Sequence, residues 1–228
     1  MCIRDSIYLN IIIMLLIITG GIGFLVWGDI GTHKHRIRRY SLQSKVVLMT
    51  SAVLIVLPAL YFFFCEYDHE TIHDRTIHSL FQSVTTRTAG FNTTDLAAMD
   101  ESGTAIMVIL MLIGGSPGST AGGMKTATFA VLFLSAITVF SRRNDVQCFK
   151  RRISDETVRS AGAVLFMYLV LFFTSGVIIS RVENLPLLTC LFETSSAIGT
   201  VGLSLGITSG LSAAVSYTHL TLPTKLEV

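Results

Sequence analysis

The sequence predicts an all-α integral membrane protein built from repeated units of a membrane span, a short half-helix and a glycine loop. Three observations support this prediction: the composition, long runs without charge, and an internal repeat. Hydrophobic residues make up 51% of the 228-residue chain and charged residues only 14%, whereas soluble domains carry about 25% charge. The mean hydropathy is +0.64. The formal net charge of +2 gives no basic excess, so no nucleic-acid partner is expected.

The two ends of the chain differ from the rest, because polar residues stand there where the pattern calls for membrane. Residues 1–6 and 215–228 resemble translated adapter sequence joined to a fragment. We set them aside as artefactual ends, as one sets aside a fusion scar. The natural protein is therefore expected to continue in both directions.

Three long apolar runs predict membrane spans. Residues 7–27, 46–65 and 160–180 contain no charged side chain, and each is long enough for a helix that crosses the bilayer, which needs about 20 residues. A fourth apolar region, residues 103–140, is interrupted by the glycine-rich stretch 114–123 and predicts a bent or broken span.

Two further apolar stretches, residues 77–86 and 185–197, are too short to cross a bilayer. We expect both to form re-entrant half-helices. For the first stretch, an interfacial helix lying along the membrane surface is the alternative.

The polar connections separate by charge. The linkers 29–45 and 142–159 are rich in Lys and Arg, whereas residues 66–76 and 93–102 are acidic. The excess of basic residues places the two linkers in the cytoplasm and the acidic connections outside. The number of spans agrees with this topology only if residues 77–92 enter the membrane and return to the same side.

An internal repeat links the two short apolar stretches. The run Leu-Phe-Gln-Ser at 80–83 recurs as Leu-Phe-Glu-Thr at 191–194. Each run follows a full span and leads to a glycine loop, residues 88–91 in the first case and 200–203 in the second. The repeated unit therefore reads span, half-helix, glycine loop, span, and residues 7–28 form the last span of an earlier unit.

The two glycine loops have the chemistry of a cation site. Extended backbone at membrane depth is tolerated only where protein buries it or where it lines a wet pore. Loops of Thr, Ala, Val and Gly offer mainly carbonyl oxygens, which replace the hydration shell of a cation in potassium filters. A single loop of this kind would be an ordinary turn at a helix end. Two such loops at matching places in a repeat favour a filter.

Three stretches carry a resemblance to a known family: QSVTTRTAGFNTTDL, MLIGGSPGSTAGGMKT and FETSSAIGTVGLSLGIT. They resemble the Trk/Ktr/HKT superfamily of cation transporters, and most closely the pore-forming subunits of bacterial Trk/Ktr potassium uptake. The resemblance implies four potassium-channel-like units around one pore. By it, the chain holds the last span of unit two (7–28), unit three (46–141) and the first part of unit four (160–214), so the fold is incomplete and this chain alone is not expected to conduct.

The resemblance also implies the residues of the site. The filter segments are Thr88, Ala89, Gly90, Phe91, Thr200, Val201, Gly202 and Leu203. Two neighbours are expected to support the filter: Asn92 fixes the exit of the first loop, and Arg87 braces that loop through backbone carbonyls.

A gate below the filter is implied by the glycine-rich stretch 114–123. Its residues are Gly114, Gly115, Ser116, Gly118, Ser119, Thr120, Gly122, Gly123 and, at the inner end, Lys125. Because glycine disfavours helix by about 1 kcal/mol relative to alanine, such a segment can move between two firmer half-helices. We expect Lys125 to face the pore or to anchor the loop. Snorkelling toward the cytoplasm is the alternative.

Ions and partners follow from the resemblance as well. It implies uptake of potassium across the bacterial plasma membrane, with sodium coupling left open, and no covalent chemistry. The family forms homodimers within membrane lipid and works with a cytosolic nucleotide-binding regulatory subunit. The basic stretches 34–39 and 142–152 are candidate docking surfaces for that subunit, or they are topology signals alone.

Two other functions are alternatives, a membrane zinc protease and an ion-coupled carrier. Residues 69–73 spell HExxH, the zinc-protease signature, but they lie in a short acidic loop without a third ligand at the usual spacing. We therefore expect neither a zinc site nor an enzyme. An ion-coupled carrier with broken helices is the other alternative.

Overall fold

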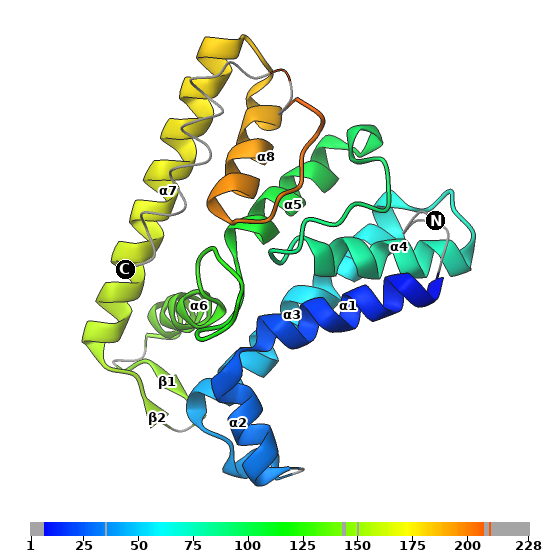
Figure 1. The fold of residues 1–228 in the computed structure, drawn as a ribbon. Coiled ribbons are helices and arrows are strands. Elements are labelled where there is room, and N and C mark those ends of the chain that lie inside the picture. Colours follow the sequence, from blue (N-terminus) through cyan, green and yellow to red (C-terminus); the bar gives the residue numbers. More distant parts are fainter. Residues whose placement is uncertain (1–6, 35, 143–144, 150, 208–209, 211–228) are drawn as a thin grey trace.

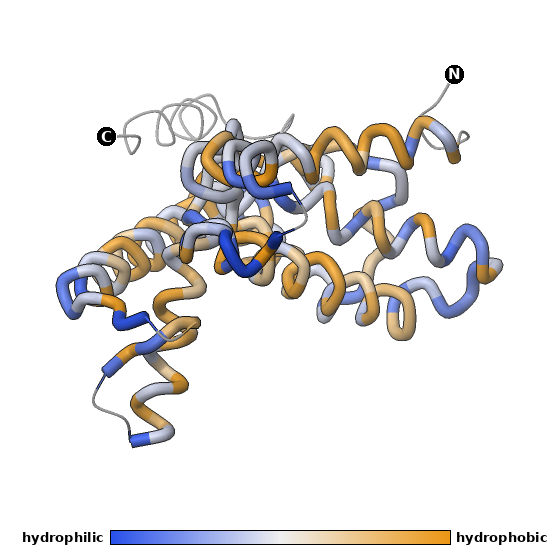
Figure 2. Tube along the Cα trace, turned by 90° about the horizontal axis from the view of Figure 1, so that it is seen from below, coloured by the Kyte–Doolittle hydropathy of each residue, from blue (hydrophilic) through white to orange (hydrophobic). Residues whose placement is uncertain are grey.

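The computed structural model describes residues 7–34, 36–142, 145–149, 151–207 and 210 (Figure 1). The two expected artefactual ends, 1–6 and 215–228, lie outside this described part. Within it the chain is mostly helical, with one small hairpin. Figure 2 shows hydrophobic residues along most of the helices and hydrophilic residues gathered at turns and helix ends.

The first expected span is bent. Helix α1 covers Ile7–Ile22 and helix α2 covers Phe24–His33, with an angle of 93° between them. The predicted span over 7–28 is therefore a bent helix pair, which is a candidate broken span. Gly23, between the two helices, has φ of +87°, a conformation that a helix interior does not allow. Helix α2 also extends into the basic linker, where a short 3-10 turn, η2, follows at Ile37–Arg39.

The second expected span is a helix that widens at its outer end. Helix α3 covers Leu42–Tyr61 and continues as the π-helical turn η3 at Phe62–Glu66. The hydroxyl of Ser41 caps its start by accepting a hydrogen bond from the Ser44 amide. Pro58 lies inside α3 and has no N–H to donate.

Helix α4, Ile72–Thr85, turns back alongside α3. Ser83 Oγ donates to the Ile55 carbonyl at 2.7 Å, and Arg87 Nη2 donates to Ser51 Oγ at 3.2 Å. Residue numbers rise along α4 as they fall along α3, so the two helices are antiparallel. Ser51 lies near the middle of α3, so the end of α4 reaches the middle of that span.

The chain then returns to the end of α3 where α4 began. The hydroxyls of Tyr67 and Thr94 lie 3.2 Å apart, and the Asp100 amide donates to Glu66 Oε1 at 2.9 Å. A 3-10 turn, η4 at Leu96–Ala98, leads into α5. The segment from Tyr67 to Asp100 therefore enters and leaves at the same end of α3.

The interrupted apolar region forms two helices. Helix α5 covers Glu101–Leu112 and helix α6 covers Thr126–Phe140. Residues 113–125, which we name the inner loop, connect them. A parallel bridge between Ile113 and Met124 joins the two ends of the inner loop.

The last part of the described chain repeats the pattern of α3 and α4. A hairpin of β1, Gln147–Cys148, and β2, Arg151–Arg152, precedes the long helix α7, Asp155–Glu183. Helix α8, Leu187–Ile198, packs back against α7 (Figure 1). The buried hydrophobic core lies where η3, α5, α7 and α8 meet; its members include Phe62, Met107, Met111, Phe172 and Phe192.

Two helices, Leu42–Glu66 and Asp155–Glu183, are long and apolar enough to cross a membrane, and the bent α1–α2 pair makes a third if it counts as one span. Large hydrophobic side chains remain exposed along α7, such as Phe166, Phe173 and Ile178. A lipid environment accommodates such a surface, whereas water penalises it. The length and apolar composition of these helices agree with the prediction of an all-α integral membrane protein.

Candidate functional site

The two half-helices end at two loops with matching backbone geometry. Helix α4 leads to residues 86–92 and helix α8 to residues 199–205. Thr88 and Gly90 have φ of +66° and +71°, and Thr200 and Gly202 have φ of +54° and +91°. The residues between them, Ala89 and Val201, are absent from the set with positive φ. The same alternation between left-handed and ordinary backbone therefore occurs in both loops.

The two glycine loops lie in direct contact. A Cβ atom added to Gly90 would stand 2.1 Å from the carbonyl oxygen of Val201 and 3.3 Å from the carbonyl carbon of Gly202. Only glycine allows the two main chains to approach so closely. The structure therefore brings the two predicted filter segments together, although they are more than a hundred residues apart in sequence.

Hydroxyl groups of the half-helices hold each loop in place. Thr85 Oγ1 donates to the Phe91 carbonyl at 2.7 Å, and the Gly202 amide donates to Ser196 Oγ at 3.1 Å. The C-terminal ends of α4 and α8 carry the negative ends of the helix dipoles, and both lead into the loops. A cation at the loops would be stabilised by this arrangement.

The two predicted supporting residues make different contacts. Asn92 Oδ1 accepts a hydrogen bond from the Thr94 amide at 3.1 Å, at the exit of the first loop. Arg87 is buried, with 7% of its surface exposed, and its hydrogen bond goes to the Ser51 hydroxyl of α3. The expected bonds from Arg87 to backbone carbonyls are not among those of the described residues. Its guanidinium instead ties the loop to the neighbouring span.

Two further residues brace the loops from the half-helices, and sequence reasoning missed both. Glu193 Oε1 accepts from Ser204 Oγ at 2.6 Å and from the Leu205 amide at 3.0 Å. Gln82, at the matching place in the repeated motif, lies 3.5 Å from the Thr94 hydroxyl. The sequence repeat could have indicated both residues, because they stand in corresponding positions of Leu-Phe-Gln-Ser and Leu-Phe-Glu-Thr.

The exit of the first loop is also held from outside the membrane segments. The Tyr67 hydroxyl lies 3.2 Å from Thr94 Oγ1. Burial raises the pKa of Tyr67 to about 12.

The inner loop lies against the second glycine loop. A Cβ atom on Gly122 would stand 2.0 Å from Thr200 Oγ1, and one on Gly123 would stand 3.5 Å from the Cα atom of Gly199. The ends of the inner loop are fixed by backbone hydrogen bonds, from Gly114 to Met124 at 2.8 Å and from Thr126 to Gly115 at 3.0 Å. The inner loop therefore has ends that are fixed by hydrogen bonds and a glycine-rich middle, and this middle lies next to the candidate filter.

The inner loop also fills the bend between α1 and α2. The Ser116 amide donates to the Gly21 carbonyl at 3.1 Å, and the Phe24 amide donates to the Gly118 carbonyl at 3.0 Å. A Cβ atom on Gly23 would stand 2.7 Å from the Pro117 carbonyl oxygen. The bend of the first helix pair is therefore built around the inner loop.

Lys125 closes the inner loop on itself. Its Nζ donates to the Ala121 carbonyl at 2.8 Å. This contact corresponds to the loop-anchoring role expected for Lys125, since the charge is used to hold a loop carbonyl.

The HExxH stretch has no geometry of a zinc site. Only its last two residues, Ile72 and His73, lie on α4, whereas His69 and Glu70 precede the helix. Glu70 Oε2 instead lies 2.7 Å from Nδ1 of His78. Among the described residues no group of three or more His, Cys, Asp or Glu could hold a metal ion.

The apolar helices, the two half-helices that pack back against α3 and α7, and the paired glycine loops are features of a helical integral membrane protein. The sequence matches the TrkH family, described as a cation transport protein, over residues 2–221. The chain belongs to this family. The resemblance seen in the three glycine-containing stretches is thereby confirmed.

Curated relatives and a solved structure agree with this assignment. The chain is 35% identical over 218 residues to the potassium/sodium uptake protein NtpJ of Enterococcus hirae, covering 92% of this chain and 48% of that protein. It is 37% identical over 211 residues to the Ktr system potassium uptake protein B of Bacillus subtilis, with coverages of 90% and 47%. The chain thus spans about half the length of these relatives.

The potassium transporter TrkH from Vibrio parahaemolyticus has a similar fold. The TM-score is 0.78 at 18% sequence identity, and the match covers 96% of this chain and 49% of that one. At this identity the likeness concerns the fold alone.

Proposed function

We propose that the full-length protein takes up potassium across the bacterial plasma membrane, with the two glycine loops as part of its selectivity filter. The observation that carries the proposal is the matched backbone of the loops, in which positive φ at Thr88 and Gly90 recurs at Thr200 and Gly202. Alternating left-handed and ordinary backbone turns successive carbonyls toward one side of a chain. A row of carbonyls is what replaces the hydration shell of a cation.

The filter residues in this proposal are those of the two loops: Thr88, Ala89, Gly90, Phe91, Thr200, Val201, Gly202 and Leu203. Relatives named as potassium uptake proteins support the choice of ion. The name of NtpJ includes sodium, so sodium remains the second ion to test. The role is transport without covalent chemistry.

Gly90→Ser is the sharpest test of the filter. Its added atoms meet the Val201 carbonyl at 2.1 Å, which displaces a carbonyl of the second loop. The full-length protein is produced in bacteria that lack other potassium uptake, and initial uptake is measured at graded potassium and sodium. We expect the preference for potassium over sodium to fall at least about tenfold, which corresponds to about 1.4 kcal/mol.

Gly162→Ser is the matched control, because a Cβ atom at Gly162 in α7 meets nothing within 4 Å. It should transport like the unmodified protein. An unaltered ion preference in Gly90→Ser, with normal amounts of protein in the membrane, would exclude the filter assignment.

The inner loop serves as the gate in this proposal. Its contact with Thr200 and with the α1–α2 bend joins the candidate filter to the first helix pair. Deletion of residues 115–122 should change potassium flux, and unchanged flux would remove the gate from the proposal. The full-length protein is further proposed to work as a homodimer with a cytosolic nucleotide-binding regulatory subunit.

A further inference from the structure

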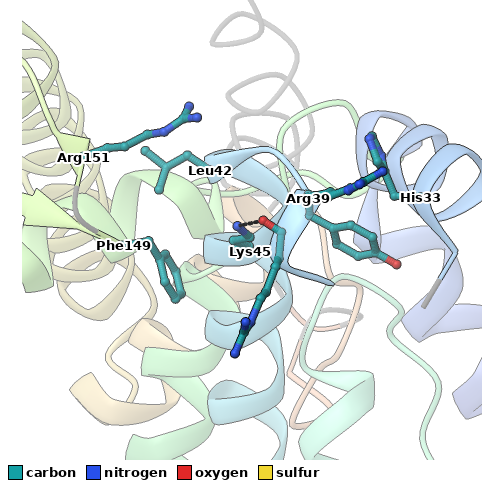
Figure 3. Close-up of a pocket in the computed structure, with 8 residues that line it drawn as sticks. His33, Arg39, Leu42, Lys45, Phe149 and Arg151 are labelled. Carbon is teal, nitrogen blue, oxygen red and sulfur yellow. Dashed lines mark hydrogen bonds between the residues drawn. The ribbon is translucent and has the colours of Figure 1, made fainter. Parts of the chain in front are cut away.

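A basic pocket lies at the inner ends of the spans, away from the glycine loops. It has a volume of about 450 Å³. Figure 3 shows Phe149 and Arg151 on one side of Lys45, and Arg39 and His33 on the other. The lining residues come from α2, η2, the start of α3 and the hairpin region: His33, Arg38, Arg39, Tyr40, Leu42, Lys45, Phe149 and Arg151.

The Arg and Lys groups of this pocket form no ion pair with a carboxylate within the described part of the chain. Four of the eight lining residues are Arg or Lys, and the lining contains no Asp or Glu. In the two basic linkers, Arg152 is the residue that pairs with carboxylates, at 3.1 Å from Asp145 and 3.7 Å from Asp155. No carboxylate of the described residues lies within 4.0 Å of the basic groups of Arg39, Lys45 or Arg151. The pocket therefore suits an anion.

Contacts from both linkers hold Lys45 in place. Lys45 Nζ donates to the Arg38 carbonyl at 2.8 Å and lies 6.0 Å from the centre of the Phe149 ring. Tyr40 is buried, and its hydroxyl donates to the Lys34 carbonyl at 2.5 Å. Residues from both linkers thus meet at one ammonium group.

The position of the pocket points to the membrane boundary. Lys45 lies in the first turn of α3, which is a candidate span. Exposed apolar side chains stand at the same end of the molecule: Ile37 is 64% exposed and Phe149 is 52% exposed. Ile37 also lines a neighbouring cavity of about 470 Å³ with Arg36, Arg38 and Arg39. Cations bordered by apolar groups at a span end match a lipid, which has a phosphate and acyl chains.

We propose that this pocket binds the phosphate headgroup of an anionic phospholipid of the cytoplasmic leaflet. The Arg and Lys groups bind the phosphate, and the exposed apolar side chains lie against the acyl chains. Free phosphate shares the charge of the headgroup but makes no use of the apolar border.

The test uses the purified full-length protein in neutral detergent, with lipid adducts counted by native mass spectrometry. Phosphatidylglycerol is compared with phosphatidylcholine, which is zwitterionic. The pocket variant is Arg39→Gln with Arg151→Gln, which removes one charge from each linker. We expect phosphatidylglycerol to bind in preference to phosphatidylcholine, and its binding to weaken roughly thirtyfold in the pocket variant.

The matched control is Arg142→Gln with Arg159→Gln, which removes the same charge from the cytoplasmic side outside the pocket. It should bind phosphatidylglycerol like the unmodified protein. If the double pocket variant does not elute as a folded protein, Arg151→Gln alone serves, because Arg151 is exposed on the hairpin.

Three results would overturn the proposal. The first is equal loss of phosphatidylglycerol in the pocket and control variants. The second is inorganic phosphate at millimolar concentration displacing the lipid from the pocket, which would identify a site for free phosphate. The third is unchanged lipid binding while the pocket variant no longer binds a cytosolic regulatory subunit, which would identify a protein-docking surface.

Discussion

Glu193 shows how a buried carboxylate supports backbone at membrane depth. It is 5% exposed, and its Oε1 accepts from the Ser204 hydroxyl and the Leu205 amide. Both donors lie just beyond Gly202, so the carboxylate fixes the segment that leaves the second glycine loop. Removing a buried acceptor leaves its donors unsatisfied, at about 1–3 kcal/mol for each.

Glu193→Ala is therefore expected to loosen the second loop. The ratio of potassium to sodium uptake should fall about tenfold, and Glu193→Gln should restore most of it because an amide oxygen still accepts. The measurement is initial uptake of both ions by the full-length protein in bacteria.

Glu156→Ala is the control for that substitution, because Glu156 is exposed in the first turn of α7. Loss of total protein without a change in the ion ratio would show that Glu193 acts on folding only. Failure of Glu193→Gln to restore the ratio would argue against its role as a hydrogen-bond acceptor.

Residues differ in how far sequence predicts them. Gly90 and Gly202 were predictable, because positive φ favours glycine at both positions and the repeat marks them; at Gly90 the close approach of Val201 adds a second reason. Asn92 was predictable as a loop exit, because its side chain bonds two residues on. The partner of Arg87 was not, since Ser51 lies 36 residues earlier and nothing local indicates that α3 and α4 pair at that register.

At the scale of elements, the contact between the inner loop and the second glycine loop can be tested by substitution. Gly122 lies so close to Thr200 that a Cβ atom would stand 2.0 Å from its hydroxyl oxygen. Gly122→Ala should therefore push the inner loop away from the second glycine loop, since overpacking costs about 1–3 kcal/mol. We expect basal potassium uptake to rise severalfold, because the displaced loop no longer closes the passage.

Gly31→Ala is the control for this substitution. A Cβ atom at Gly31 in α2 meets nothing within 4 Å, so its uptake should equal that of the unmodified protein. Unchanged or lower basal uptake in Gly122→Ala would contradict the closing role of the contact.

The elements also show where local patterns stop being informative. The apolar run 7–27 predicts a span but gives no sign of a bend, yet the chain turns by 93° at Gly23. The cause is distant in sequence, since Ser116 and Gly118 supply the hydrogen bonds at the bend. By contrast, the start of α4 at Ile72 has a local cause. The Thr71 hydroxyl caps the helix by accepting from the Asp74 amide, so polar residues before the apolar stretch become helical.

At the scale of the whole molecule, the repeats share one core. Helix α5 belongs to the first repeat, but it packs against α8 of the second, and residues of both form the cluster around Met107 and Phe192. The repeat in the sequence predicts two similar units. The repeat does not predict that α5 packs against α8. The helices of both units have similar hydrophobic faces, so the sequence does not show which helices contact each other.

Sidedness is the last property to test, and it concerns the whole chain. The basic linkers predict a cytoplasmic location for Asp155, whereas the segment from Tyr67 to Asp100 enters and leaves at one end of α3. His69 and Glu101 should therefore both face outward. If residues 77–92 crossed the membrane instead, Glu101 would lie on the side opposite His69.

Single cysteines reveal these positions in the full-length protein, with Cys65, the exposed native cysteine of the described residues, changed to serine. His69→Cys and Glu101→Cys should react with a membrane-impermeant maleimide in intact cells, because both residues are exposed. Asp155→Cys, whose native side chain is 66% exposed, should react only after the membrane is permeabilised. Labelling of Glu101→Cys only in permeabilised cells would show that the first half-helix and its loop cross the membrane. The two glycine loops could then not enter from the same side, and the paired filter would have to be abandoned.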